Sequence, residues 1–375
     1  MFIRYWSIAL FFLFFSHINA QSLEAVNDFN SGVDAYRKSN FSQAIHLYTQ
    51  AVTRDPNYIN AYYNRGNCWL GMKDFEMAKQ DFEKVIALDE NHEKAYLFKG
   101  YCELLQKKYA EAIQSLDMAI RLNPNSEKAY INRGTANLNT ENYAQAEDDL
   151  THAISLGSQS HVTFQNRGIA RSKQGKNIEA MSDFMMASDL KPDFLESTKE
   201  LSKIYLKLEK WNEAIASLTS ALRIDASNAD FYHQRGYAKL MKEDLNGAIT
   251  DFSICLELDP AHKSAAENKA IADYKMGNFE AAVMDYTDVI KFSPKNATLF
   301  VQRGICLLEI KQFDRAITDF DQAIKINSGL AEAYFNRANA YSKTMDFKSA
   351  CKDIKQSAKL GYEPANAHVN ALCNL

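Results

Sequence analysis

A repeating unit of 34 residues constrains this chain more than any other feature of its sequence. When the sequence is divided every 34 residues from Ala25, ten units follow one another without insertion or deletion. They span 25–58, 59–92, 93–126, 127–160, 161–194, 195–228, 229–262, 263–296, 297–330 and 331–364. A fixed period of this length indicates one local structure stacked many times, so the fold of one unit predicts the fold of the run.

Small residues recur at fixed positions of the unit, counted from 1 to 34. Position 20 is alanine in all ten units, position 8 is glycine in seven, and position 27 is alanine in six. Position 17 is aromatic in eight units, and five of the six prolines stand at position 32. Apolar residues recur twice per unit at three- and four-residue spacing, which predicts two amphipathic helices over positions 1–14 and 18–31.

The glycines at position 8 need a compensating gain, because glycine inside a helix costs about 1 kcal/mol relative to alanine. We expect that gain from close packing of the first helix against the alanines at positions 20 and 27 of the second. Proline at position 32 is expected to end the second helix and to set the next turn. A single helical hairpin cannot bury its own apolar face, so neighbouring units must stack into a solenoid.

This pattern resembles the tetratricopeptide repeat (TPR) family. Small residues at positions 8, 20 and 27, aromatic residues at 4, 17 and 24, and proline at 32 agree in register over 340 of the 375 residues. The resemblance implies an all-α, right-handed superhelix of helix pairs, with first helices lining a concave groove and second helices forming the outer wall. Residues 365–375 continue the helical pattern and are expected to cap the end of the stack.

A pair of opposite charges also recurs, with arginine at position 7 and aspartate at position 23. The pairs are Arg65 with Asp81, Arg133 with Asp149, Arg167 with Asp183, Arg235 with Asp251, Arg303 with Asp319, and Arg337 with Asp353. Two units lack both charges, Lys269 accompanies Asp285, and Lys99 with Ser115 breaks the rule. Because the two positions vary together, we expect a partly buried structural bond between helices. A ladder of arginines that faces a ligand is the alternative.

Amides recur at position 6, where helix propensity gives them no reason to be. They are Asn30, Asn64, Asn132, Asn166, Asn268 and Asn336, together with Gln234 and Gln302. An amide can both donate to and accept from a peptide backbone. The pattern resembles the asparagine ladder by which some TPR superhelices hold extended peptides. Hydrogen bonds between adjacent repeats are the alternative.

The unit 195–228 lacks the glycine, the charged pair and the proline, and its first helix presents lysines on one face. Lys199, Lys203 and Lys207 follow at four-residue spacing, with His233 and Tyr237 in the next unit and Tyr63 and Tyr101 at similar positions earlier. Such a surface would suit an acidic segment or a terminal carboxylate. Alternatively, the lysines are solvated and paired with Glu196 and Glu200. The carboxylate-clamp pattern of chaperone-binding TPR proteins is not reproduced, because Lys94 and Lys128 match single positions only.

Residues 1–20 differ in character from the repeats, and residues 21–24 form a short lead. Arg4, the apolar run at 8–15 and the small residue Ala20 predict a secretory signal peptide that is cleaved after Ala20. The run is far shorter than the roughly 20 residues that a membrane-spanning helix needs. We therefore expect a mature chain without a transmembrane segment, exported to a periplasm or secreted.

Cysteine placement suggests one disulfide. Cys68, Cys102 and Cys306 share position 10 and Cys255 replaces a packing alanine, so these four are expected in the core. In an exported protein, a bond between Cys351 and Cys373 would pin the C-terminal cap. Two free thiols are the alternative.

The remaining composition excludes several function classes. A net charge of −4 gives no electrostatic basis for binding nucleic acid. No histidine spacing suits a metal, and the phosphate-loop and hydrolase motifs are missing, so we expect neither a cofactor nor an enzyme. The favoured interpretation is a scaffold or assembly factor that binds a protein or peptide in its groove. A structural spacer with an empty groove and a regulatory subunit of a separate enzyme are the alternatives.

Overall fold

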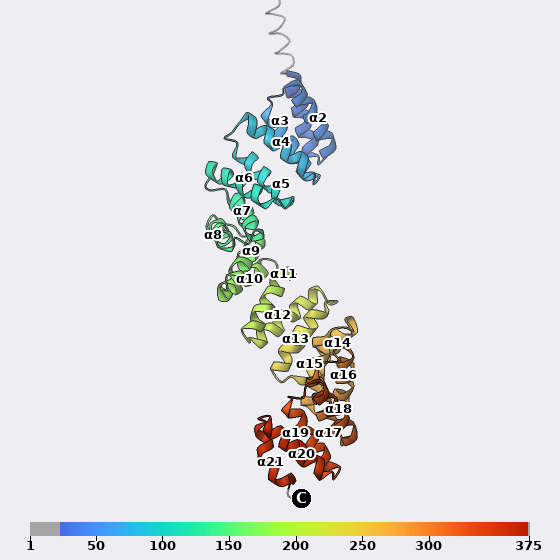
Figure 1. Ribbon diagram of the computed structural model, residues 1–375. Coiled ribbons are helices and arrows are strands. Elements are labelled where there is room, and N and C mark those ends of the chain that lie inside the picture. Colours follow the sequence, from blue (N-terminus) through green and yellow to red (C-terminus); the bar gives the residue numbers. More distant parts are fainter. Residues whose placement is uncertain (1–22, 374–375) are drawn as a thin grey trace, which may run out of the picture. The chain divides into compact units, whose positions relative to one another are not determined.

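The computed structural model describes residues 23–373, and the expected signal peptide lies outside this range. All regular structure from 23 to 373 is helical, with no strand. A helix over 23–37 comes first, and the labelled helices follow it in Figure 1. The expected all-α repeat fold is therefore confirmed. The handedness of a superhelix stays a prediction, as does cleavage after Ala20.

The helices alternate between first and second members of each repeat. The first helices are α3 Ile59–Gly71, α5 Glu93–Leu105, α7 Glu127–Asn139, α9 His161–Lys173, α11 Leu195–Lys207, α13 Ala229–Met241, α15 Lys263–Met276, α17 Ala297–Glu309 and α19 Ala331–Lys343. The second helices are α2 Phe41–Arg54, α4 Phe75–Leu88, α6 Tyr109–Leu122, α8 Tyr143–Ser155, α10 Asn177–Leu190, α12 Trp211–Ile224, α14 Leu245–Leu258, α16 Phe279–Phe292, α18 Phe313–Ile326 and α20 Phe347–Lys359. A last helix, α21 Glu363–Cys373, follows α20. Each first helix from α3 to α19 begins 34 residues after the one before it.

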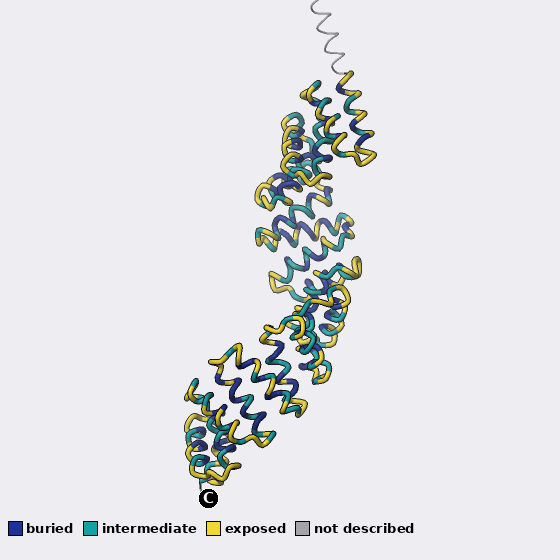
Figure 2. The backbone as a smooth tube through the Cα atoms, turned by 90° about the vertical axis from the view of Figure 1, so that its right-hand side faces the viewer, coloured by how far each residue is buried: buried dark blue, intermediate teal, exposed yellow. Residues whose placement is uncertain are grey.

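The chain divides into two compact units at the peptide between Ser197 and Thr198, inside α11. Consecutive helices pack against each other from α2 to α10 in one unit and from α12 to α21 in the other, and the first helices α5 and α7, α7 and α9, α13 and α15, and α17 and α19 also touch. Figure 2 shows buried residues along the helices and exposed residues gathered at the turns. The faces that bury apolar area are thus those between neighbouring helices, as stacking of amphipathic hairpins requires.

Alanine and glycine allow this close packing, though not in the way that the pattern suggested. Every alanine at position 20 is fully buried, including Ala78 and Ala112. The glycines at position 8 lie under the side chain at position 24 and not chiefly against the alanines. A Cβ atom on Gly66 would lie 2.9 Å from the Phe82 ring, and one on Gly168 would lie 2.7 Å from the Phe184 ring. Glycine therefore makes room for a large buried side chain of its own repeat.

The turn between the two helices of a repeat was the least visible feature in the sequence. All ten second helices begin at position 17, one residue earlier than expected, because the residue at position 15 takes a left-handed backbone conformation. Its φ is 62° in Lys73, 61° in Lys107 and 82° in Gly277, and the other repeats are alike. Only two of the ten residues at this position are glycines. Side chains such as lysine tolerate this conformation at a cost. Glycine therefore does not recur at position 15, and the sequence does not indicate the turn.

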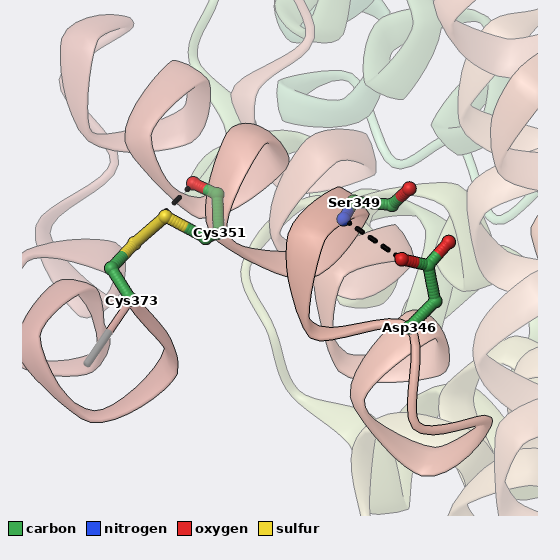
Figure 3. The surroundings of a disulfide bond; sticks show 4 residues. All are labelled: Asp346, Ser349, Cys351 and Cys373. Atoms are coloured by element: carbon green, nitrogen blue, oxygen red, sulfur yellow. Dashed lines mark hydrogen bonds between the residues drawn. A yellow bond between two sulfur atoms is a disulfide. The ribbon is translucent and has the colours of Figure 1, made fainter. Parts of the chain in front are cut away.

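The C-terminal end is closed as expected, by α21 packed against α20. A disulfide joins Cys351 of α20 to Cys373 of α21, with their Cα atoms 4.9 Å apart (Figure 3). The same view shows the start of α20, where the Asp346 carboxylate accepts a hydrogen bond from the backbone N–H of Ser349 at 3.0 Å. Cys68, Cys102, Cys255 and Cys306 are free and buried.

Candidate functional site

The six arginines at position 7 each bond to two second helices. In every case Nε and Nη2 donate to the aspartate at position 23 of the same repeat, over 2.6–3.2 Å. In each case Nη1 donates to position 25 of the preceding repeat, where Thr49, Asp117, Thr151, Thr219, Thr287 and Asp321 accept. Each guanidinium also lies 5.4–5.7 Å from the centre of the aromatic ring at position 4 of its own helix.

These contacts place the arginines inside the framework and not on a ligand-binding face. Asp81, Asp149 and Asp251 are 4%, 6% and 1% exposed, so each carboxylate is taken out of water together with its partner. Charge-assisted bidentate bonds of this kind fix geometry as well as adding energy. Each arginine therefore joins three helices and sets the register between adjacent repeats.

The exception at Lys99 has a structural explanation that sequence comparison missed. Ser115 stands where other repeats have aspartate, and its Oγ donates to Glu103 Oε2 at 2.7 Å. Glu103, at position 11, is 4% exposed and lies 3.6 Å from Lys99 Nζ. The carboxylate has thus moved from the second helix to the first. Positions 7, 11 and 23 converge on one place, which the pairwise comparison of positions 7 and 23 could not reveal.

Two adjoining hollows lie on the first helices of the second, third and fourth repeats. One of about 210 Å³ lies along α5 and α7 and is lined by Leu97, Phe98, Tyr101, Lys128, Ile131 and Asn132. The other, of about 350 Å³, is lined by Tyr63, Glu93, Lys94, Leu97, Phe98, Asn123, Ser126, Glu127 and Lys128. Both hollows share Leu97, Phe98 and Lys128, so they form one continuous depression, which we call the α5–α7 face.

The α5–α7 face combines apolar walls with polar groups that the fold leaves unused. Phe98 takes the place of the usual amide, and its ring stacks on Phe82 at 5.6 Å and lies 6.1 Å from Tyr63. Glu93 is occupied, because it accepts a hydrogen bond from Ser126 Oγ at 2.9 Å. Among residues 23–373, neither Lys128 nor the Asn132 side chain has an ion-pair or hydrogen-bond partner. An ammonium group and an amide therefore border an apolar hollow.

Three of the other amides at position 6 are bonded to groups of the fold. Asn166 Nδ2 donates to Thr135 Oγ1 of the preceding repeat at 3.1 Å, and Asn268 Nδ2 lies 3.2 Å from His233 Nε2. Asn336 donates to the carbonyl oxygen of Glu332 in its own helix. These three make the bonds within and between repeats that were the alternative to a ladder, so the bond from Asn166 to Thr135 favours the alternative at that position. Asn64, Gln234 and Gln302 line neither hollow.

The lysines of α11 and the aromatic residues of α13 do not line these hollows either. Lys203 pairs with Glu200 at 2.6 Å, as the alternative for this helix proposed, and Lys199 and Lys207 border neither hollow. Tyr237 packs edge-on against Trp211, with ring centres 6.1 Å apart.

His233 is part of the fold and not a free ligand-binding group. Its ring lies 4.6 Å from the His262 ring and 6.0 Å from Phe252. Burial, reinforced by His262, lowers the pKa of His233 to about 4, so its imidazole is neutral near pH 7. A neutral histidine that bonds to Asn268 offers no charge to an acidic partner.

Two other kinds of site are not found among the residues that the structure describes. Between residues 23 and 373, no three histidine, cysteine, aspartate or glutamate side chains gather in a way that could hold a metal ion. Within the same range, no helix has the length and apolar character needed to cross a membrane.

Family models match much of the chain. Models described as "Tetratricopeptide repeat" match residues 59–92 and residues 93–126, 127–157 and 331–360. A model described as "TPR repeat" matches 203–242 and 307–344. Together these matches cover about half of the chain, in both of its units.

Solved structures of similar fold are also found. The C-terminal part of a TPR repeat-containing protein from Cytophaga hutchinsonii is 17% identical, covers 64% of this chain and 98% of its own, and has a TM-score of 0.53. YrrB, described as a TPR protein with an unusual peptide-binding site, is 20% identical, covers 50% of this chain and 97% of its own, and has a TM-score of 0.47. Yeast Tom70 is 17% identical, covers 93% and 88%, and has a TM-score of 0.34. At these identities the likeness concerns the fold.

Proposed function

The chain belongs to the tetratricopeptide repeat family, and from this premise we propose that it is a non-catalytic scaffold that holds a segment of another protein on the α5–α7 face. The fold itself supports a role in protein interaction, because stacked helical repeats present extended surfaces to partners. The observation that carries the more specific proposal is the hollow bordered by Lys128 and Asn132.

The chemistry of the face supports an apolar side chain as the anchor. Leu97, Phe98, Tyr101 and Ile131 supply four of the six lining residues of the smaller hollow. Filling it would remove apolar surface from water on both partners, at about 25 cal/mol per Å². The hollow is small, so it suits one or two side chains of a segment and not a whole folded domain.

The polar groups support an extended segment and not a purely apolar contact. The Asn132 amide can donate to a carbonyl oxygen and accept from an N–H, which matches an exposed peptide backbone. Lys128 stands beside it and would favour a carbonyl or carboxylate oxygen near the anchor. A segment with an apolar side chain next to exposed backbone meets these groups together.

We propose further that the protein works after export, in a periplasm or as a secreted protein. The signal-like pattern of residues 1–20 supports this location, as does the disulfide between Cys351 and Cys373, since disulfides persist in oxidising compartments. The mass of the purified protein tests the export step: a chain that retains Met1 in its native compartment would contradict it.

The binding proposal is tested with two matched double variants. Peptides are selected from a display library of random 12-residue segments against the full protein, and their dissociation constants are measured by calorimetry. Tyr101→Ala with Asn132→Ala alters the α5–α7 face. Tyr237→Ala with Asn268→Ala alters the corresponding positions in α13 and α15.

We expect the first double variant to weaken binding at least about tenfold, which is 1.4 kcal/mol, and the second to leave it unchanged. Circular dichroism confirms that both variants are folded. A selected peptide that binds all three proteins equally, or that is lost only in the second variant, would contradict the proposal.

A further inference from the structure

The eighth repeat, residues 263–296, has a different charge arrangement from every repeat that carries arginine. Lys269 Nζ lies 2.9 and 2.8 Å from the two carboxylate oxygens of Asp285 and 3.1 Å from Asp273 Oδ2. The side chains of Lys269, Asp273 and Asp285 are 18%, 4% and 18% exposed. Two carboxylates with little access to water thus share one ammonium group.

The repeats with arginine balance their charges differently. In the ninth repeat, Arg303 faces Asp319, and position 11 is the apolar residue Leu307. In the seventh repeat, Asp251 receives both Arg235 and Lys239, so the cations are in excess. In the eighth repeat the anions are in excess, which like-charge repulsion and desolvation both oppose.

The helices packed around this cluster do not supply the missing cation. On α14, Ser253 stands where other repeats contribute threonine or aspartate, and Glu257 is exposed. On α17, the guanidinium of Arg303 is bonded to Asp319 and Thr287.

The remaining charged groups nearby are paired, acidic or exposed to solvent. On α13, Lys239 pairs with Asp251. On α16, Lys291 pairs with Asp288, and Glu280 is exposed. On α15 itself, Glu267 adds a further acid, while Lys275 is exposed. The remaining direct partner of Asp273 is the neutral Asn278 amide, which donates to Oδ1 at 3.1 Å.

We propose that Lys269, Asp273 and Asp285 form a proton-responsive joint between α15 and α16, which takes up one proton on acidification and is tighter in that state. With one carboxyl protonated, its O–H can donate to the other carboxylate, and Lys269 then neutralises the single charge that is left. With both carboxylates charged, one of them lacks a counter-ion inside the hairpin. The six arginine repeats have no carboxylate at position 11. The second carboxylates that Arg133 and Arg337 contact, Asp117 and Asp321, are 48% and 52% exposed and so stay in contact with water.

The titration of Asp285 agrees with this geometry. Burial, reinforced by Asp273 and opposed by Lys269, raises the pKa of Asp285 to about 6. Between its ordinary value near 3.8 and about 6, the folded state binds a proton that the unfolded state does not. The contribution to stability therefore grows as the pH falls from about 7 towards about 4, and is lost as the pH rises through 6.

His233 acts in the opposite direction in the same part of the protein, because its pKa is lowered to about 4. Below about pH 6.5 the unfolded state binds a proton that folded His233 does not, so acid weakens that contact. A test on the wild type alone would add the two effects. The wild type is therefore compared with a variant that changes only the joint. The contribution of His233 is the same in both proteins and drops out of the difference.

The test uses Asp273→Asn, which keeps the Oδ1 acceptor for Asn278 and removes the second charge. Hydrogen-exchange protection factors of the α15 and α16 amides are measured at pH 5.0 and 7.5 for both proteins. We expect the protection ratio of wild type to variant to rise by about tenfold or more on going from pH 7.5 to 5.0. The amides of α17 and α18 around Arg303 and Asp319 serve as the internal control and should show no such change.

Equal ratios at the two pH values would overturn the proposal. If the variant does not fold, carboxyl carbon-13 spectra of the wild type decide instead. A titration near pH 6 that is assigned to Asp273 or Asp285 supports the joint, and assignment is needed because burial also raises the pKa of Asp81. Complete ionisation of all aspartates above pH 5 overturns it.

Discussion

The helix pairs α5–α7 and α13–α15 use equivalent residues in different ways. Tyr101 and Tyr237 share position 9 and are 37% and 36% exposed. Asn132 and Asn268 share position 6 one repeat later. Yet Asn132 borders an apolar hollow, whereas Asn268 is bonded to His233.

The difference follows from position 5 of the preceding repeat. Leu97 occupies it in α5 and cannot bond to an amide, so Asn132 keeps its donors and acceptor for another molecule. His233 occupies it in α13 and takes up the amide of Asn268. A repeated position therefore does not define a binding site. The residue one repeat earlier decides whether the amide serves a partner or the fold, which makes the α13–α15 pair structural in our account.

The largest expected effect concerns the framework that the two pairs share. Arg133→Ala in α7 leaves Asp149 buried with only the Asn137 amide, so we expect a loss of about 3–5 kcal/mol in the free energy of unfolding. Arg235→Ala in α13 should cost less, about 1–3 kcal/mol, because Lys239 remains 2.8 Å from Asp251. Urea unfolding followed by circular dichroism measures both. Equal losses, or a loss under about 1 kcal/mol for Arg133→Ala, would show that neighbouring cations do not matter as we claim.

A smaller effect is a difference in how the stability of the α13–α15 and α5–α7 pairs depends on pH. The lowered pKa of His233 means that the stability of the α13–α15 contact falls as the pH drops from about 6.5 towards 4. The joint at Lys269 contributes equally to the wild type and to His233→Gln, so the difference in stability between the two proteins isolates the histidine. We expect that difference to shift by about 1–3 kcal/mol against the wild type on going from pH 7 to 4.5. The α5–α7 pair has Leu97 at this position and should lack the effect. Thermal unfolding at pH 4.5 and 7 measures it, and an unchanged pH profile in the variant would argue against a buried neutral histidine.

The smallest expected effect on stability comes from substitutions in the turns that follow α5 and α15. Gly277 has φ of 82°, so Gly277→Lys should cost about 1 kcal/mol through left-handed strain. Lys107 already has φ of 61°, and Lys107→Gly should change stability by only a few tenths of a kcal/mol. Relief of strain is there offset by the greater freedom of glycine in the unfolded chain. The difference in melting temperature between the two variants checks this, and a larger effect for Lys107→Gly would reverse our interpretation of the turn.

The sequence could predict the helix pairs, the TPR fold and the arginine contacts, because each rests on residues at fixed spacing within one repeat. Arg133 and Asp149 vary with their equivalents in the other units, and such paired variation signals contact. The role of Glu103 was missed because it replaces a carboxylate from another helix. This role can be recognised only once the structure shows that positions 7, 11 and 23 of a repeat lie together.

The candidate site was only partly predictable for a similar reason. Tyr63, Tyr101 and Asn132 were expected to face a partner, and they do line the hollows. The bond from Asn166 to Thr135 could not be predicted, because Thr135 belongs to the preceding repeat and lies outside any pattern within one unit. The shape of the hollow depends on how the Phe98 ring packs against Phe82, which spacing alone does not specify.

Site-specific photo-crosslinking tests the central claim most directly. A photoreactive phenylalanine analogue is placed in separate proteins at Tyr101 and at Tyr237, which are equivalent in position and exposure. Each protein is irradiated with the peptide selected against the wild type. Our account predicts a covalent adduct from position 101 and none from position 237. Adducts of equal yield at both positions, or an adduct from position 237 alone, would contradict it.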